Sequence, residues 1–186
     1  MLMPVYGMFL ILNTGTHLSL LSFQAKQSIL IITLISTAIL PVTILPLLFQ
    51  FKVIKSFRME SARERFIPIL ITAFFYYTGY LLMKKMGVPT MLNKFVFASL
   101  IAVFISAIVS YFWKISIHAI GIGGVTGVIA AISILYRIDL LMLQIFLLII
   151  SALTISARLY LGEHNPKQVY AGYFCGFLTV FCFVIF

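Results

Sequence analysis

Long apolar runs separated by short polar stretches make up nearly the whole chain. Each run is close to the roughly 20 apolar residues that carry a helix across a bilayer, and the alternation typical of a barrel strand is missing from them. The pattern therefore predicts an all-α, polytopic membrane helix bundle of six to seven transmembrane helices, with residues 1–186 forming a single domain. The expected spans cover approximately residues 2–23, 27–51, 66–83, 94–113, 119–136, 139–157 and 166–186.

The first two runs contain residues that disturb a regular helix. A polar stretch from Asn13 to His17 interrupts the first run, so we expect a broken, tilted or partial span there. The second run contains Pro41 and Pro46, which remove backbone donors and should kink the helix.

Glycine pairs at helical spacing mark the fifth and the last run. Gly123 and Gly127 form a GxxxG pair, and so do Gly172 and Gly176. Because small residues let helix backbones approach closely in a membrane, these two helices are expected to form the tightly packed centre of the bundle.

Composition excludes a soluble protein. The chain is 63% hydrophobic and 9% charged, against about half and a quarter in soluble domains. Its formal net charge is +9, yet no basic stripe lies outside the bilayer-length runs, so nucleic acid is not an expected partner. The surplus charge instead indicates a membrane topology bias or an anionic ligand, with membrane lipids as the surroundings.

Polar residues gather in stretches that follow alternate helices. They lie near residues 52–65, 114–118 and 158–168, after the second, fourth and sixth runs. Because successive helices cross the bilayer in opposite directions, all three stretches should emerge on one side, whether or not the first run spans.

Two histidines on that side, His118 and His164, lie close in sequence to several Arg and Lys residues. Ionisable groups at membrane depth are costly and point to function. Cationic side chains can hold a phosphate while one imidazole attacks phosphorus and a second protonates the leaving oxygen. Acidic residues are too few to suggest a Mg²⁺ site, so we expect metal-free phosphoryl transfer, with no metal and no cofactor.

Three motifs resemble those of the type 2 phosphatidic acid phosphatases, which share a helical core with vanadium-dependent haloperoxidases. The family motifs are KxxxxxxRP, PSGH and SRxxxxxHxxxD. The third is matched best, by ARLYLGEHNPKQVYAG at residues 157–172; the second is matched by ISIHA at 115–119, and the first, weakly, by Arg58 and Arg65 followed by Phe66. The chain thus resembles a divergent member of this superfamily, with the phosphatase-like core over about residues 55–180.

The resemblance implies a role for each matched residue. His164 would be the nucleophile that forms a phosphohistidine, and His118 the general acid. The phosphate would be held by a cradle of Arg58, Arg65, Ser116 and Arg158.

The chain departs from the family at Gln168, which stands where the family has the Asp that orients the nucleophile. A Gln carbonyl can fix the histidine tautomer but cannot supply charge to the imidazolium, so weakened activity is expected. A structural interpretation also exists: Asn165, Pro166 and Gln168 have the pattern of a helix start with a capping box.

Two functions follow. The first is a phosphatase acting on a lipid phosphate monoester or pyrophosphate, with a lipid phosphate as the substrate. The alternative is a catalytically silent relative that binds an anionic headgroup or has a structural or transport role. The oligomeric state and the membrane orientation stay open, because the basic residues nearly balance once the proposed ligands are set aside. The resemblance implies a bacterial cytoplasmic membrane with the site on its outer face.

Overall fold

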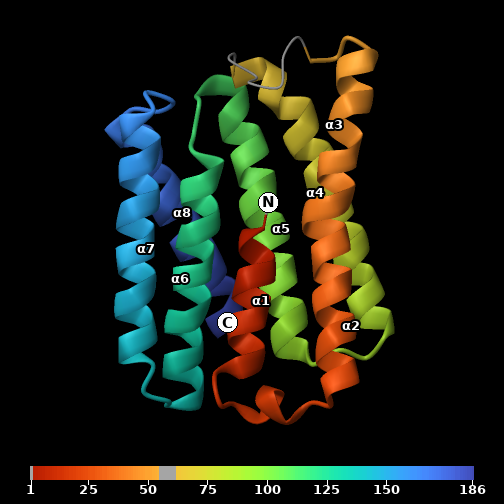
Figure 1. Ribbon diagram of the computed structural model, residues 1–186, viewed down its shortest axis with the longest axis vertical. Coiled ribbons are helices and arrows are strands. Elements are labelled where there is room, and N and C mark those ends of the chain that lie inside the picture. The colour runs from red at the N-terminus through yellow and green to blue at the C-terminus, as the bar shows by residue number, and fades with distance from the viewer. Residues whose placement is uncertain (1, 55–61) are drawn as a thin grey trace.

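The computed structural model describes residues 2–54 and 62–186 as an all-helical bundle, and no strand occurs within these ranges (Figure 1). In chain order the elements are α1 (Met3–Asn13), the 3₁₀ turn η1 (His17–Leu20), α2 (Phe23–Leu34), the π-helical turn η2 (Ile35–Ile39), α3 (Leu40–Gln50), α4 (Ala62–Lys85), α5 (Thr90–Phe112), α6 (Ile117–Tyr136), α7 (Leu141–Tyr160) and α8 (Pro166–Ile185).

Six helices in the described residues are long and apolar enough to cross a membrane, with α2, η2 and α3 forming one continuous span, Phe23–Gln50. This finding confirms the all-α bundle and the lower of the two expected helix counts. The large number of outward-facing apolar side chains on α7 fits the same interpretation: only 11% of its span is buried inside the protein. The six apolar helices suggest an integral membrane protein.

Helix α1 is a partial span, as the polar stretch after it predicts. Its 11 residues extend about 16 Å, roughly half of a hydrocarbon core of about 30 Å. The N-terminal end of α1 lies about halfway along the bundle, beside longer helices (Figure 1). Met8, Ile11 and Leu12 are fully buried, whereas Tyr6 and Phe9 are more than half exposed, so one face of α1 belongs to the core.

The irregularity expected in the second span takes the form of a widened turn. The π-helical turn Ile35–Ile39 ends two residues before Pro41, whose ring leaves the carbonyl four residues earlier without its usual donor. Hydroxyl groups also bond to carbonyls here: Thr33 donates to Ile29 at 2.8 Å and Thr37 donates to Thr33 at 2.7 Å.

Helices α6 and α8 pack backbone to backbone through their glycines. A Cβ atom at Gly176 would overlap the carbonyl oxygen of Ile120, and one at Gly123 would overlap that of Tyr173. A Cβ at Gly172 would lie 2.7 Å from the carbonyl oxygen of Ser116. Because backbone atoms cannot move aside, these positions require glycine, and both predicted GxxxG pairs lie in this contact.

The two ends of the bundle differ in chemistry. We call the end where α6 and α8 begin, at Ile117 and Pro166, the motif end; α4 also begins there and α3, α5 and α7 end there (upper end in Figure 1). At the other end His17 packs its ring edge-on against Tyr136, with 5.3 Å between centroids. The alternation of helix directions therefore brings the described parts of the three polar stretches, residues 52–54, 62–65, 114–118 and 158–168, to one side, as expected.

The glycine contact can be tested by comparing two alanine substitutions. Gly176→Ala should destabilise the bundle by about 1–3 kcal/mol, because its methyl group meets the Ile120 backbone. Gly124→Ala is the matched control, since its methyl group would lie 3.2 Å from the Val180 side chain, which can adjust. Unfolding of both variants in detergent micelles measures the difference. Equal stability would show that the close approach of α6 and α8 is not constrained by glycine.

Candidate anion-binding and catalytic site

A cavity of about 1010 Å³ opens inside the bundle and extends to the motif end. Its wall is apolar over most of its length. The charged and histidine side chains among its lining residues are gathered at the motif end: Arg65, His118, Arg158, Glu163 and His164. We call these five residues the polar cluster. An apolar cavity with a few convergent polar groups is the usual form of a ligand site.

Different helix ends supply the members of the polar cluster. Arg65 lies in the first turn of α4, and His118 is the second residue of α6. Arg158 lies in the last turn of α7, and His164 precedes Asn165, the residue that caps α8. The cluster is thus assembled by tertiary packing from positions up to 99 residues apart in the sequence.

The ring of His164 is fixed by two acceptors on one of its nitrogens. Nδ1 lies 3.3 Å from the backbone carbonyl oxygen of Lys114 and 3.2 Å from Oε1 of Gln168. A carbonyl oxygen can only accept, so in the neutral ring Nδ1 carries the proton. Nε2 is then left with a lone pair, which is the form that a nucleophilic histidine needs.

Gln168 has both of the roles that the sequence offered as alternatives. Its Oε1 accepts a hydrogen bond from the backbone N–H of Asn165 at 3.1 Å, while Oδ1 of Asn165 accepts one from the Gln168 N–H at 3.0 Å. This pair is a complete capping box at the start of α8. Because a carbonyl oxygen has two lone pairs, the same Oε1 can also hold the imidazole of His164.

The segment between α5 and α6 is docked onto the start of α8. Lys114 provides the carbonyl that holds His164, and the N–H of Ser116 donates to the backbone carbonyl of Gln168 at 3.3 Å. Ser116 itself is fully buried and is not among the residues that line the cavity; its hydroxyl accepts from the N–H of Ala119 as the cap of α6. The geometry thus gives Ser116 a capping role, and a phosphate contact stays a prediction.

The pKa of the His164 imidazole is lowered from its ordinary value of 6.5. Burial is the main cause, since the residue is 7% exposed, and the charges of Arg65 and Arg158 lower it further. The hydrogen bonds to Gln168 and to the Lys114 carbonyl act in the opposite direction and only in part offset the others. At neutral pH His164 is therefore uncharged, with Nε2 unprotonated.

A carboxylate lies inside the polar cluster, which the sequence reasoning missed. Oε2 of Glu163 lies 3.8 Å from Nη2 of Arg158, and the Glu163 charge also acts on Arg65. Nε of Arg158 is buried without a hydrogen-bond partner in the described residues. The position of Glu163, directly before His164 in the best-matched motif, was the one available signal. A carboxylate among two guanidinium groups competes with any incoming anion.

The predicted site residues are thus partly brought together. Arg65, His118, Arg158 and His164 line one cavity, with Gln168 behind His164. Arg58 lies outside the described residues. Comparisons with protein-family models, with curated proteins and with solved structures find no match for this chain.

The competing carboxylate yields a binding prediction. Glu163→Gln should tighten binding of inorganic phosphate or vanadate by about two- to fivefold, because a partly exposed ion pair is worth up to about 1 kcal/mol. Asp139→Asn is the control, since it removes the same charge before α7, at the end remote from the cluster. Titration calorimetry in detergent measures both affinities. Equal tightening by the two variants would indicate a general charge effect instead.

The state of His164 yields a pH prediction. In NMR spectra of histidine-labelled protein, His164 should titrate with a midpoint below pH 6.5, because burial and two nearby cations disfavour its protonation. The unfolded chain binds this proton near pH 6.5 and the folded one does not, so the stability due to His164 falls as the pH drops from about 6.5 through the folded pKa. Gln168→Glu keeps the capping box and adds a negative charge, which should raise the midpoint. An unchanged midpoint would contradict contact between residue 168 and the imidazole.

Proposed function

We propose that this protein is a membrane-embedded phosphatase-like enzyme acting on a lipid phosphate monoester or pyrophosphate through a phosphohistidine. The observation that carries the proposal is the convergence of His118, His164, Arg65 and Arg158 at the polar end of one apolar cavity. Two guanidinium groups suit a phosphate, which they can hold bidentately, and the apolar cavity suits a substrate with a hydrocarbon part.

The proposed reaction has two steps. Nε2 of His164 attacks phosphorus, and the bond between phosphorus and the ester oxygen breaks. His118, which takes up a proton when the anionic phosphate binds beside it, gives that proton to the leaving alcohol. Water then attacks the phosphohistidine with His118 as the general base, which releases inorganic phosphate and restores His164. Arg65 and Arg158 stabilise the charge on the non-bridging oxygens in both steps.

The hydrogen bonds of His164 support its role as the nucleophile. The Lys114 carbonyl and Gln168 hold the proton on Nδ1, so the attacking nitrogen needs no prior deprotonation. Gln168 supplies orientation without charge, and the imidazolium-like phosphohistidine is therefore less stabilised than beside a carboxylate. We accordingly propose slow turnover.

A second function, a silent anion-binding relative, is favoured by one feature of the cluster. Glu163 places a negative charge beside Arg158, where the phosphate of a substrate would bind. A protein that binds an anionic headgroup but does not hydrolyse it can function with this carboxylate in the site. Turnover measurements distinguish such a protein from an enzyme.

The decisive experiment measures phosphate release from a short-chain lipid phosphate by the purified protein in detergent, without Mg²⁺. We expect slow hydrolysis in the wild type, none in His164→Ala, and a rate about 10- to 100-fold higher in Gln168→Asp, by analogy with the effect of mutating residues that orient metal-bound histidines. His17→Ala is the control, because this third histidine packs against Tyr136 at the other end of the bundle.

Two outcomes would reject parts of the proposal. Unchanged turnover in His164→Ala would exclude His164 as the nucleophile. If neither the wild type nor Gln168→Asp released phosphate, while phosphate or vanadate still bound, the silent relative would be the better description.

A further inference from the structure

The deep part of the cavity is the feature that the phosphate chemistry leaves unexplained. On α4 its lining residues extend from Arg65 to Tyr76, and on α5 from Ser106 to Phe95. Each interval corresponds to a helical rise of about 16 Å, close to the depth of one leaflet of a hydrocarbon core of about 30 Å. The cavity therefore has the depth of a lipid chain that begins at the headgroup level.

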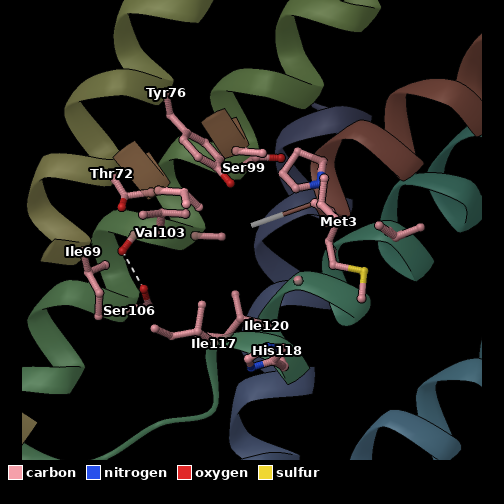
Figure 2. A pocket seen from close by; sticks show the side chains of 18 of the residues that line it. Met3, Ile69, Thr72, Tyr76, Ser99, Val103, Ser106, Ile117, His118 and Ile120 are labelled. Atoms are coloured by element: carbon pink, nitrogen blue, oxygen red, sulfur yellow. Dashed lines mark hydrogen bonds between the residues drawn. The ribbon is translucent and has the colours of Figure 1, made fainter. Parts of the chain in front are cut away.

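The half-length of α1 is the reason that the cavity exists. Because α1 packs against α2, α5 and α6 only in the half of the bundle remote from the motif end, it leaves the space beside these helices open in the other half. The first turn of α1 closes the cavity from below: Leu2, Met3 and Pro4 line it, and Met3 lies against Gly121 of α6. Figure 2 shows Met3 on one side of this space and Thr72 and Tyr76 on the other, with Ser99 between them.

Three hydroxyl groups of the wall are already hydrogen-bonded within the protein. Thr72 donates to the carbonyl oxygen of Pro68 at 2.8 Å, and Ser106 donates to that of Val103 at 2.7 Å (Figure 2). The Tyr76 hydroxyl shares a hydrogen bond with Thr37. Water would therefore gain few partners in the deep cavity, whereas methylene groups would find an apolar wall.

The cavity also opens sideways, towards the surroundings of the bundle. Leu2 and Tyr6 of α1, Ile39 of η2 and Val42 of α3 line it and are each about half exposed. Ile39 and Val42 lie 11 and 8 residues before Gln50, the last residue of the span, which places them about 16 and 12 Å below its end. A lateral opening at this depth faces lipid chains, since only hydrocarbon is present there.

We propose that this cavity is a binding site for one aliphatic chain of about leaflet length, which belongs to the same lipid whose phosphate the polar cluster holds. The lipid enters sideways from the bilayer between α1 and the η2–α3 segment. This inference rests on the proposed function for the identity of the headgroup. It adds the substrate class: a phosphorylated lipid with a medium-length acyl or short isoprenoid chain, held inside the bundle.

Photolabelling of the full chain in phosphatidylcholine nanodiscs tests the site without requiring turnover. The probe is tetradecylphosphonate, which cannot be hydrolysed at its carbon–phosphorus bond, with a diazirine near the chain end. We expect labels on cavity residues near the first turn of α1, namely Met3, Phe95 and Val125. Labels confined to outward-facing residues such as Phe104, Leu148 and Phe174 would overturn the proposal.

Two tryptophan substitutions on α5 provide a matched pair. Val103 lines the cavity, whereas the neighbouring Phe104 is 45% exposed on the outer face. Val103→Trp should lower cavity labelling about tenfold or more, since each methylene group lost from burial costs about a factor of four. Phe104→Trp should leave it unchanged. If Val103→Trp does not fold, the label positions in the wild type alone decide the matter.

A neutral probe separates the inference from the proposed function. Tetradecanol with the same diazirine should label the cavity less than the phosphonate does, because it lacks the anion that the polar cluster holds. Equal labelling by both probes would overturn the proposal that the aliphatic chain in the cavity and the phosphate at the polar cluster belong to one lipid. If phosphate release is absent but the phosphonate labels the cavity selectively, the proposed catalytic function is rejected, while the proposed binding site for an aliphatic chain is supported.

Discussion

The close approach of α6 and α8 is the constraint on which the rest of the structure depends. Glycines at 123, 127, 172 and 176 let the two backbones touch, and the first turns of both helices are thereby held side by side at the motif end. His118 enters the cavity from one of these turns, and His164 precedes the other. In lipid, where apolar burial does not drive helices together, such backbone contact is a principal source of cohesion. The proposed chemistry is thus built on a packing contact that contains no reactive group.

The polar cluster contains groups that attract an anion and a carboxylate that competes with it. Two guanidinium groups and two imidazoles favour an anion, while Glu163 already places one carboxylate among them. Gln168 connects this cluster to the fold, because its amide oxygen serves the helix cap and the imidazole together. The positive charge of the site is therefore neutralised in part by the protein's own Glu163, and the phosphate of the proposed substrate would compete with this carboxylate for Arg158.

The sequence predicted the helices and their order well, because a span needs a long apolar run and a loop needs polar residues. The partial first span followed from the polar stretch at Asn13, and the shared side of His118 and His164 followed from alternating helix directions. Side-chain positions were harder to predict from the sequence. The buried capping role of Ser116, the ion pair of Glu163 and the cavity left by α1 depend on helix rotation and depth, which hydropathy does not encode. Arg58 lies outside the described residues, so its role stays a prediction.

The sharing of Gln168 between a cap and an imidazole has a consequence for the order in which the site is built and lost. Asn165, Gln168 and His164 lie within five consecutive residues, so their hydrogen bonds form as soon as the first turn of α8 exists. Arg65 and His118 come from helices that are distant in the sequence and join only when the bundle is packed. Loosening of the bundle would therefore disperse the cations and the chain cavity first, while the histidine kept its tautomer. The local sequence thus holds the proton on Nδ1 through Gln168, whereas long-range packing adds the Lys114 carbonyl, Arg65 and His118.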